Sequence, residues 1–306
     1  MSVDTSVRLP GMMLKNPILT ASGTFGYGLE FTNYGDLTTL GGIAVKGLSL
    51  LPRLGNPMPR LAETPCGMLN AIGLQNCGVE TFLRDKLPRL PWRETPVIAN
   101  LYACDADDFA ELAGVLAGAE GIAALEVNIS CPNVKAGGIA FGQDPSMAGR
   151  LTESVKKRAG DKPVWVKLSP NVTDLVAVAR AAVLAGADAL TCINTLTGMS
   201  VDIRSRKPRL ANIIGGLSGP AIKPVALRCV WQVCQAVSVP VIGVGGICSA
   251  EDVLEFLLVG AHAVQIGTAS FMRPDMAFRI AERLPALMEE LGIESLESYR
   301  GTLQTS

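Results

Sequence analysis

Residues 97–101 have the sequence VIANL, a short apolar run that carries a polar residue, Asn100, near its end. Seven more runs of this kind are ILTAS (18–22), GIAVKG (42–47), ALEVNIS (124–130), VWVKLS (164–169), ALTCIN (189–194), VIGVGG (241–246) and AVQIGT (263–268). They are rich in Val, Ile and Leu and lack strict alternation, which is typical of parallel strands buried on both faces. The sequence therefore predicts eight buried strands.

Segments with helical spacing separate these runs. They cover residues 105–117, 173–185, 221–237, 249–259 and 275–291. Thr173 is expected to cap the second helix, and Ser249 with Asp252 forms a possible capping box on the fourth. Strands that alternate with helices favour the α/β class and a closed (β/α)₈ barrel of the TIM type. An open doubly wound sheet is the alternative, weakened because GVGGIC at 243–248 fails the G-x-G-x-x-G pattern at its last position.

The chain of 306 residues shows no linker and no low-complexity tract, which predicts a single domain over residues 1–306. Two stretches, 47–78 and 195–220, are too long for simple connections between a strand and a helix. Loops of this length in a barrel enzyme are usually functional, and both stretches follow predicted strands. We therefore expect two long loops at the C-terminal face of the barrel, where such enzymes carry their sites.

Bulk composition excludes several classes of protein. A formal net charge of −1 argues against nucleic acid as the main partner. With no signal peptide and no apolar run of about 18 residues, the sequence predicts a soluble, cytoplasmic protein without a membrane partner. His262 is the one histidine and the eight cysteines form no C-x-x-C pair, so neither a metal site nor a disulfide framework is expected. Apart from Cys131, the cysteines are interpreted as small core residues.

Polar residues and glycines end the eight apolar runs and should meet at one mouth of the barrel: Ser22, Lys46, Asn100, Asn128, Lys167, Asn194, Gly245 with Gly246, and Gly267 with Thr268. Buried lysine and asparagine side chains are costly unless paired, so the rim predicts a polar ligand with many acceptors. Glycines after the last two strands suit a phosphate held by backbone N–H groups. FMN meets this description, although the spacing does not separate it from other phosphorylated ligands.

Cys131 directly follows the fourth run, and a thiol in such a position can serve as a general base. The segment NISCPN (128–133) resembles the active-site segment of class 1 dihydroorotate dehydrogenases. Further segments resemble the same family in the same order: TASGTFGYG (20–28), ETPCGMLNAIGLQN (63–76), VKLSPNVTD (166–174), GGLSGPAIKP (215–224) and AEDVLEFLLVGAHAVQIGTA (250–269). The resemblance covers nearly the whole chain and is strongest to the class 1B branch.

The resemblance implies a role for each matching position. FMN would be bound by Ser22, Lys46, Gly47, Asn100, Asn128, Lys167, Ile193, Gly219, Gly245, Gly246, Gly267 and Thr268. Dihydroorotate would be bound by Lys46, Asn70, Ala71, Ile72, Gly73, Leu74, Asn128, Asn194 and Thr195. Cys131 would be the catalytic base, and Lys46 and Lys167 would complete the catalytic set. Arg53 stands where the family has a loop arginine near the site, and Cys77, which departs from the family pattern, is expected to serve packing.

The class 1B resemblance also implies partners and an electron acceptor. Members of this branch pass electrons to NAD through a second subunit that carries FAD and a [2Fe–2S] cluster, in a heterotetramer built on a dimer of the catalytic chain. This chain has no dinucleotide-binding fingerprint and no cysteine set spaced for a cluster. FAD and the cluster are therefore expected on the partner subunit alone.

Several alternatives remain at this point. A class 1A enzyme would be a homodimer that uses fumarate. Another flavin barrel could act on a different reduced pyrimidine, as dihydropyrimidine dehydrogenase modules and tRNA dihydrouridine synthases do. A flavin-free lyase or isomerase would use the glycines for a substrate phosphate and would be colourless. A non-catalytic scaffold on the same fold would have no use for the polar rim.

Overall fold

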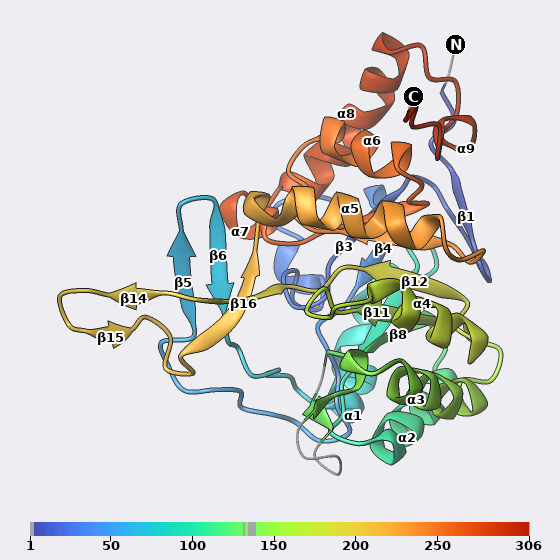
Figure 1. Ribbon diagram of the computed structural model, residues 1–306. Helices are drawn as coiled ribbons and strands as arrows, with labels where there is room; N and C mark the ends of the chain where they lie inside the picture. The colour runs from blue at the N-terminus through green and yellow to red at the C-terminus, as the bar shows by residue number, and fades with distance from the viewer. Residues whose placement is uncertain (1–2, 131, 134–138, 306) are drawn as a thin grey trace.

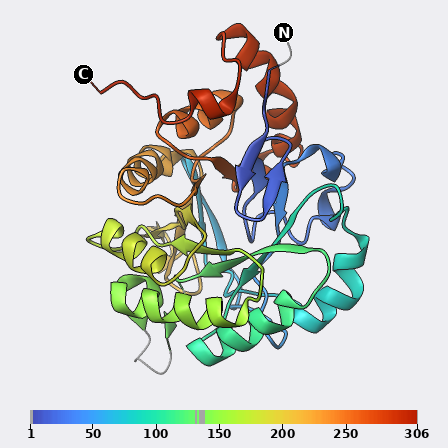
Figure 2. The ribbon, with the colours of Figure 1, turned by 90° about the vertical axis from the view of Figure 1, so that its right-hand side faces the viewer.

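Eight parallel strands close into a barrel in the computed structural model, which describes residues 3–130, 132–133 and 139–305. In order around the barrel they are β11 (Val164–Leu168), β12 (Ala189–Cys192), β17 (Val241–Val244), β18 (Ala263–Ile266), β3 (Ile18–Thr20), β4 (Gly42–Ala44), β7 (Val97–Leu101) and β8 (Ile122–Asn128). Helices surround these strands (Figures 1 and 2). The predicted TIM-type barrel is confirmed, and each predicted run contains one of its strands, β8 beginning two residues earlier.

Burial on both faces explains why these runs lack alternation. Every residue of β7 and of β11 is buried, because one face of each strand points into the barrel and the other packs under helices. Trp165 on β11 is the largest fully buried side chain. Two positions along, Lys167 points to the same face of the strand, so the barrel interior changes from apolar to polar toward the carboxyl ends of the strands.

The outer layer consists of six longer helices: α2 (Ala106–Ala117), α3 (Pro145–Arg158), α4 (Leu175–Leu184), α5 (Lys223–Cys234), α6 (Ala250–Leu258) and α8 (Met276–Glu290). Five of them fall in the predicted helical segments. The helix α3 was not predicted, although its buried residues Ala148, Leu151, Thr152 and Val155 have helical spacing; one of these four is the polar Thr152. Its start is nevertheless well specified, because Asp144 caps it and Pro145 occupies its first position.

Side-chain caps fix where these helices begin. The predicted capping box is confirmed, since Ser249 Oγ accepts from the Asp252 N–H at 3.1 Å and the Asp252 carboxylate accepts from the Ser249 N–H at 3.1 Å. The prediction for Thr173 is wrong. Asp174 caps α4 instead, and its Oδ1 accepts from the Ala177 N–H at 2.9 Å. A carboxylate at this position also interacts favourably with the helix dipole.

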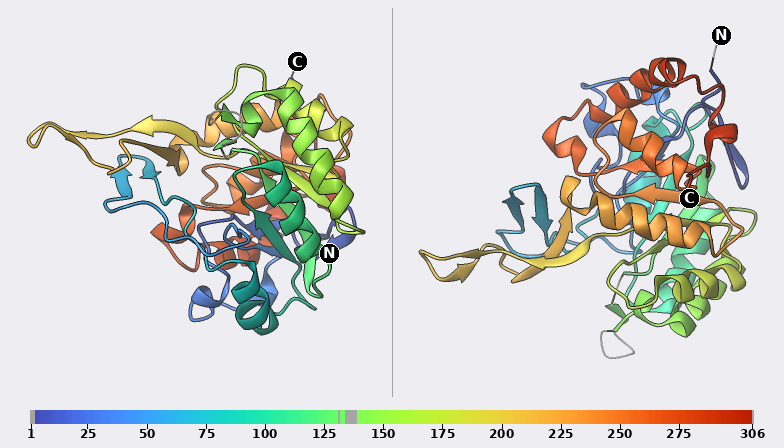
Figure 3. Two further views of the ribbon diagram at one scale, coloured as in Figure 1. Left: turned by 90° about the horizontal axis from the view of Figure 1, so that it is seen from below. Right: turned by 45° about the horizontal axis from the view of Figure 1, so that its top comes forward.

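A second, antiparallel sheet lies beside the mouth of the barrel. Its strands, in the order β13 (Leu196–Met199), β16 (Ile214–Ser218), β6 (Gly67–Asn70) and β5 (Leu61–Thr64), come from the two stretches expected to be long loops. The hairpin β14 (Val201–Asp202) and β15 (Lys207–Pro208) continues beyond the sheet and projects away from the barrel (Figures 1 and 3). The predicted loops are therefore a structured platform, and its projecting hairpin exposes Ile203.

Shorter elements complete the chain: β1 (Val7–Leu9), β2 (Met12–Leu14), β9 (Pro132–Asn133), β10 (Ile139–Ala140), α1 (Val79–Thr81), α7 (Ala269–Met272), α9 (Leu296–Tyr299), and single turns at Leu29–Phe31, Leu37–Thr39, Phe82–Lys86, Leu87–Arg89, Phe141–Gln143 and Pro220–Ile222. Within the described ranges, no helix is both long and apolar enough to cross a membrane. Cys77 packs against the core as predicted, whereas Cys66, also expected in the core, is exposed in the turn between β5 and β6.

His262, the residue before β18, should make the stability of the protein depend on pH. Burial lowers the pKa of its imidazole from 6.5 to about 4, and the charge of Arg300 acts in the same direction. The unfolded chain therefore binds a proton between these pH values that the folded protein does not, so stability falls as the pH falls through this window. We expect the unfolding free energy of the wild type to drop by about 2 kcal/mol more than that of His262→Asn between about pH 7 and about pH 5. Denaturant titrations at both pH values would measure this, and equal losses would contradict it.

Candidate active site

A cavity of about 630 Å³ opens at the carboxyl ends of the barrel strands. Its lining includes every polar or glycine residue that the sequence predicted at a strand end: Ser22, Lys46, Asn100, Asn128, Lys167, Asn194, Gly245, Gly246, Gly267 and Thr268. Their predicted convergence on one mouth is therefore confirmed. The volume falls within the range of about 300–1,000 Å³ that small-molecule and cofactor sites occupy.

The remaining predicted binding residues that the structure describes also line this cavity. They are Gly47, Asn70, Ala71, Ile72, Gly73, Leu74, Ile193, Thr195 and Gly219. Asn70 ends β6 and Thr195 precedes β13, so the platform sheet contributes one wall. The catalytic cysteine predicted at Cys131 lies outside the described residues. The structure thus places the predicted residues together, and the role of each stays a prediction.

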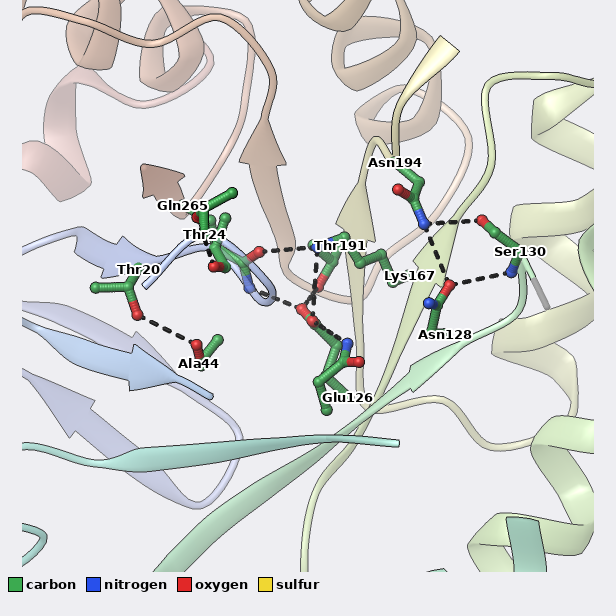
Figure 4. A network of polar contacts seen from close by, with 12 residues as sticks. Thr20, Thr24, Ala44, Glu126, Asn128, Ser130, Lys167, Thr191, Asn194 and Gln265 are labelled. Carbon is green, nitrogen blue, oxygen red and sulfur yellow. Dashed lines mark hydrogen bonds and ion pairs between the residues drawn. The ribbon is translucent and has the colours of Figure 1, made fainter. Parts of the chain in front are cut away.

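A buried carboxylate, Glu126 of β8, lies beneath the floor of the cavity and was not predicted (Figure 4). Its Oε1 accepts from Asn100 Nδ2 at 2.7 Å, and its Oε2 accepts from Thr191 Oγ1 at 2.8 Å and from Gln265 Nε2 at 2.7 Å. Lys167 Nζ lies 3.7 Å from Oε1. Residues of five barrel strands therefore meet around one carboxylate.

Lys167 is held at this floor by two oxygen atoms. Besides the ion pair with Glu126, its ammonium donates to Gln265 Oε1 at 3.4 Å. Only 7% of the lysine side chain and none of the glutamate side chain is exposed. Breaking a buried ion pair by removing one partner typically costs about 3–5 kcal/mol, because the other charge is left buried alone. The ammonium is therefore fixed in place before any ligand arrives.

Amide and hydroxyl groups form a second cluster on the side of β8 and β12. Asn194 Nδ2 donates to Asn128 Oδ1 at 3.2 Å and to Ser130 Oγ at 2.9 Å (Figure 4). Asn128 Oδ1 also accepts from the Ser130 N–H at 3.2 Å, and Asn194 Oδ1 accepts from the Thr195 N–H at 2.8 Å. These bonds fix the orientation of the amides at the wall of the cavity. Such groups can donate and accept, which suits a ligand with amide functions.

Positive charge gathers on the opposite wall. Lys46 is half-buried, and its pKa is lowered first by burial and then by the nearby guanidinium of Arg60, while the carboxylate of Glu30 acts in the other direction. Arg60 and Glu30 line the cavity as well. Two positive charges on one wall of a cavity favour an anionic ligand beside them. Arg53, the loop arginine expected near the site, instead stacks over the ring of Tyr102 at 4.9 Å and is not among the lining residues.

The loops after β17 and β18 close the remaining side. Thr268 Oγ1 donates to Ser218 Oγ at 2.7 Å, and this hydrogen bond connects the last loop to the platform sheet. Gly246 has φ +75°, and a Cβ there would lie 2.8 Å from Lys223 Cβ. A side chain would therefore push the loop off the start of α5. Two further residues line this side and were not predicted as site residues: Ser218, which lies within the segment GGLSGPAIKP (215–224), and Cys248, which was expected to be a core residue.

Comparison with known proteins identifies a family that matches nearly the whole chain. The family model for dihydroorotate dehydrogenase matches residues 5–288. The chain is 88% identical over 304 residues to the protein named dihydroorotate dehydrogenase B (NAD(+)), catalytic subunit, of Solidesulfovibrio magneticus, with 99% of each chain covered. Proteins of the same name from Maridesulfovibrio salexigens and Pelobacter propionicus are 68% and 58% identical, over 99% of this chain and 99% and 100% of theirs.

Proposed function

The chain belongs to the dihydroorotate dehydrogenase family, and from that premise we propose that it oxidises dihydroorotate to orotate in pyrimidine biosynthesis, with FMN bound in the cavity described above. The observation that carries the proposal is the convergence of two lysines and four asparagines on one cavity at the carboxyl ends of the strands, Lys46, Lys167, Asn70, Asn100, Asn128 and Asn194. A flavin, a dicarbonyl ring and a carboxylate all need donors of this kind.

The residues present fit FMN. Lys167 supplies a buried cation at the floor, where the ring of a flavin becomes negatively charged on reduction. The loops that contain Gly246 and Thr268 can direct backbone N–H groups at a phosphate, as the corresponding loops of many barrels do. The proposed FMN residues are Ser22, Lys46, Gly47, Asn100, Asn128, Lys167, Ile193, Gly219, Gly245, Gly246, Gly267 and Thr268, all of which line the cavity.

The substrate is proposed to lie against the amide cluster and the platform sheet. Lys46 and the side chains of Asn70, Asn128, Asn194 and Thr195, with the backbone of Ala71, Ile72, Gly73 and Leu74, surround this part of the cavity. Asn70 Nδ2 donates to the carbonyl of Gly216 at 3.2 Å, and this bond fixes the orientation of the Asn70 amide at the wall of the cavity. The positive wall near Lys46 suits the carboxylate of dihydroorotate.

Oxidation removes two hydrogens from neighbouring carbons of the substrate ring. Bound FMN supplies the two-electron acceptor for the hydride from C6. We assign the proton on C5 to Cys131, a residue outside the described part of the chain, on the family resemblance of its segment. Lys46 holds the substrate carboxylate, and Lys167 places positive charge where the negative charge of the reaction develops. Ligands that fill the cavity would displace water from around these groups, and a lower local dielectric would strengthen both interactions.

A partner subunit is proposed to carry the electrons onward to NAD. The relatives are named as catalytic subunits of NAD(+) enzymes, which implies a second subunit for them. We infer that FAD and a [2Fe–2S] cluster reside on that partner, in a cytoplasmic heterotetramer built on a dimer of this chain. The projecting hairpin supports a protein contact, because it exposes Val201 and Ile203 and the nearby platform exposes Met199.

The partner can be tested with the purified proteins. The isolated chain should be reduced by dihydroorotate but should reduce NAD far more slowly than the complex with its partner subunit does. The absorbance of the NADH that forms gives both rates. Equal rates of NAD reduction with and without the partner would refute the proposal that the partner subunit transfers the electrons to NAD. Turnover with fumarate alone would move the chain to the class 1A alternative.

The visible spectrum is the central test of the proposed function. The purified chain should be yellow, and its flavin band should bleach when dihydroorotate is added without oxygen. A yellow protein that bleaches only with another reduced pyrimidine would keep the flavin and change the substrate. A colourless protein that cannot take up added FMN would refute the proposal and favour a flavin-free barrel enzyme.

A further inference from the structure

The carboxylate of Glu126 has no role in the reaction as described, yet the floor of the cavity is organised around it. We propose that Glu126 is a positioning residue, which orients the amide of Asn100 and anchors the ammonium of Lys167 so that both face the ring of the cofactor. The inference rests on the proposed function, because it takes a flavin as the ligand above the floor. It requires no contact between Glu126 and that ligand.

The orientation of Asn100 follows from the chemistry of its partner. An ionised carboxylate only accepts hydrogen bonds, so the Asn100 amide must direct its Nδ2 toward Glu126 Oε1, at 2.7 Å. The carbonyl oxygen of the same planar amide then points away from Glu126. It lies 3.0 Å from the position that a Cβ on Gly47 would take, and Gly47 lines the cavity. The floor therefore offers a fixed acceptor at this place.

Gln265 completes the arrangement on the other side of the carboxylate (Figure 4). Its Nε2 donates to Glu126 Oε2 at 2.7 Å, which leaves its Oε1 to accept from Lys167 Nζ at 3.4 Å. The Glu126 carboxylate thus orients the side-chain amides of both Asn100 and Gln265, and the Gln265 amide directs its oxygen toward Lys167. With the ion pair at 3.7 Å, Lys167 depends on Glu126 both directly and through Gln265.

The resulting pattern on the floor is an acceptor from Asn100 next to a cation from Lys167. Such a pair suits a ring edge on which an N–H stands beside a carbonyl oxygen and a nitrogen that becomes negative, as the pyrimidine edge of a flavin provides. An amide in place of the Glu126 carboxylate could not maintain this arrangement of the Asn100 acceptor beside the Lys167 cation. The side chain of Glu126→Gln would direct an NH₂ group at a neighbour that now donates, and either Asn100 or Gln265 would have to turn over.

The test is the affinity of the full-length, deflavinated chain for FMN, measured by quenching of FMN fluorescence. Glu126→Gln should raise the Kd for FMN about tenfold or more, the effect of losing one charge-assisted hydrogen bond. The matched control is Thr191→Val, which removes the 2.8 Å hydrogen bond to the same carboxylate but leaves the charge, Asn100 and Lys167 as they are. Its Kd should stay within about threefold of the wild type.

An exchanged pair separates positioning from general loosening of the core. In the double variant Glu126→Gln with Gln265→Glu, the new glutamine can accept from Asn100 and donate to the new glutamate, which still faces Lys167. This variant should recover the Kd of the wild type to within about threefold. If Glu126→Gln alone does not fold, the double variant carries the test by itself, because it keeps the pair, the charge and the volume.

The outcomes are distinct. An unchanged Kd in a folded Glu126→Gln variant would overturn the inference, and so would a folded double variant that binds FMN as weakly as the single one. A loss of affinity in Thr191→Val as large as that in Glu126→Gln would also overturn it, since any disturbance of the network would then suffice. Failure of the wild type itself to bind FMN would instead refute the proposed function.

Discussion

Cys131→Ala is expected to slow the reduction of bound FMN by dihydroorotate by about 10²–10⁴-fold, the usual contribution of a general base. The proton on C5 would lose its proposed acceptor, whereas the lysines and amides that are proposed to bind FMN and substrate are unchanged. Anaerobic stopped-flow mixing, with the flavin band as the signal, measures this step without the partner subunit. The visible spectrum of the variant before mixing should match that of the wild type.

The control for this variant is Cys77→Ala. Cys77 is half-buried, packs against the core and donates its N–H to Tyr27 Oη at 3.0 Å, a backbone bond that alanine keeps. Flavin reduction in this variant should proceed at close to the wild-type rate. If Cys131→Ala reduced its flavin as fast as Cys77→Ala, the assignment of the base would be wrong.

Lys167→Met should have the second largest effect, slowing flavin reduction by about 10²–10³-fold. This is the range seen when a single group that stabilises developing negative charge is removed. The variant leaves Glu126 buried without its cation, so it should also lose about 3–5 kcal/mol of stability. Rates must therefore be taken from the folded, FMN-loaded fraction, whose content the absorbance of the flavin gives.

Lys156→Met is the matched control for Lys167. Lys156 of α3 also pairs with a carboxylate, that of Asp188 just before β12, but both side chains are partly exposed and neither lines the cavity. This variant should reduce its flavin at the wild-type rate with only a small loss of stability. A normal rate in a folded Lys167→Met variant would remove the lysine from the catalytic set.

The barrel and its rim could be predicted because each signal is local. A strand buried on both faces shows itself as an apolar run, and the polar residue that ends the run, such as Asn100 or Lys167, stands within the same few residues. The rule that strand ends of a parallel barrel meet at one face then brings these residues together. No knowledge of pairing between distant segments was needed.

The platform sheet could not be predicted, because its strands are short and partly exposed and its pairing is distant. Asn70 pairs with Gly216 across 146 residues, and neither strand alternates clearly enough to show a buried face. The N-cap of α4 was also predicted wrongly, because two neighbouring residues, Thr173 and Asp174, can both cap a helix and the structure uses Asp174. Glu126 was not predicted as a site residue, because a single carboxylate within an apolar run matches no sequence motif. Its role depends on partners that stand on four other strands.

The platform sheet has a consequence for how such enzymes can diversify. Asn70 and Thr195, proposed to contact substrate, stand at the ends of platform strands, whereas Lys167, Asn100 and Glu126 belong to the barrel. Part of the proposed substrate contact, Asn70 and Thr195, is therefore encoded in or beside the platform strands, whereas Lys46, Asn128 and Asn194 would contribute to it from the ends of barrel strands. Mutations in β6, β13 and their flanking turns would therefore alter the part of the substrate contact that the platform provides, while Lys167, Asn100 and Glu126 on the barrel strands stay unchanged.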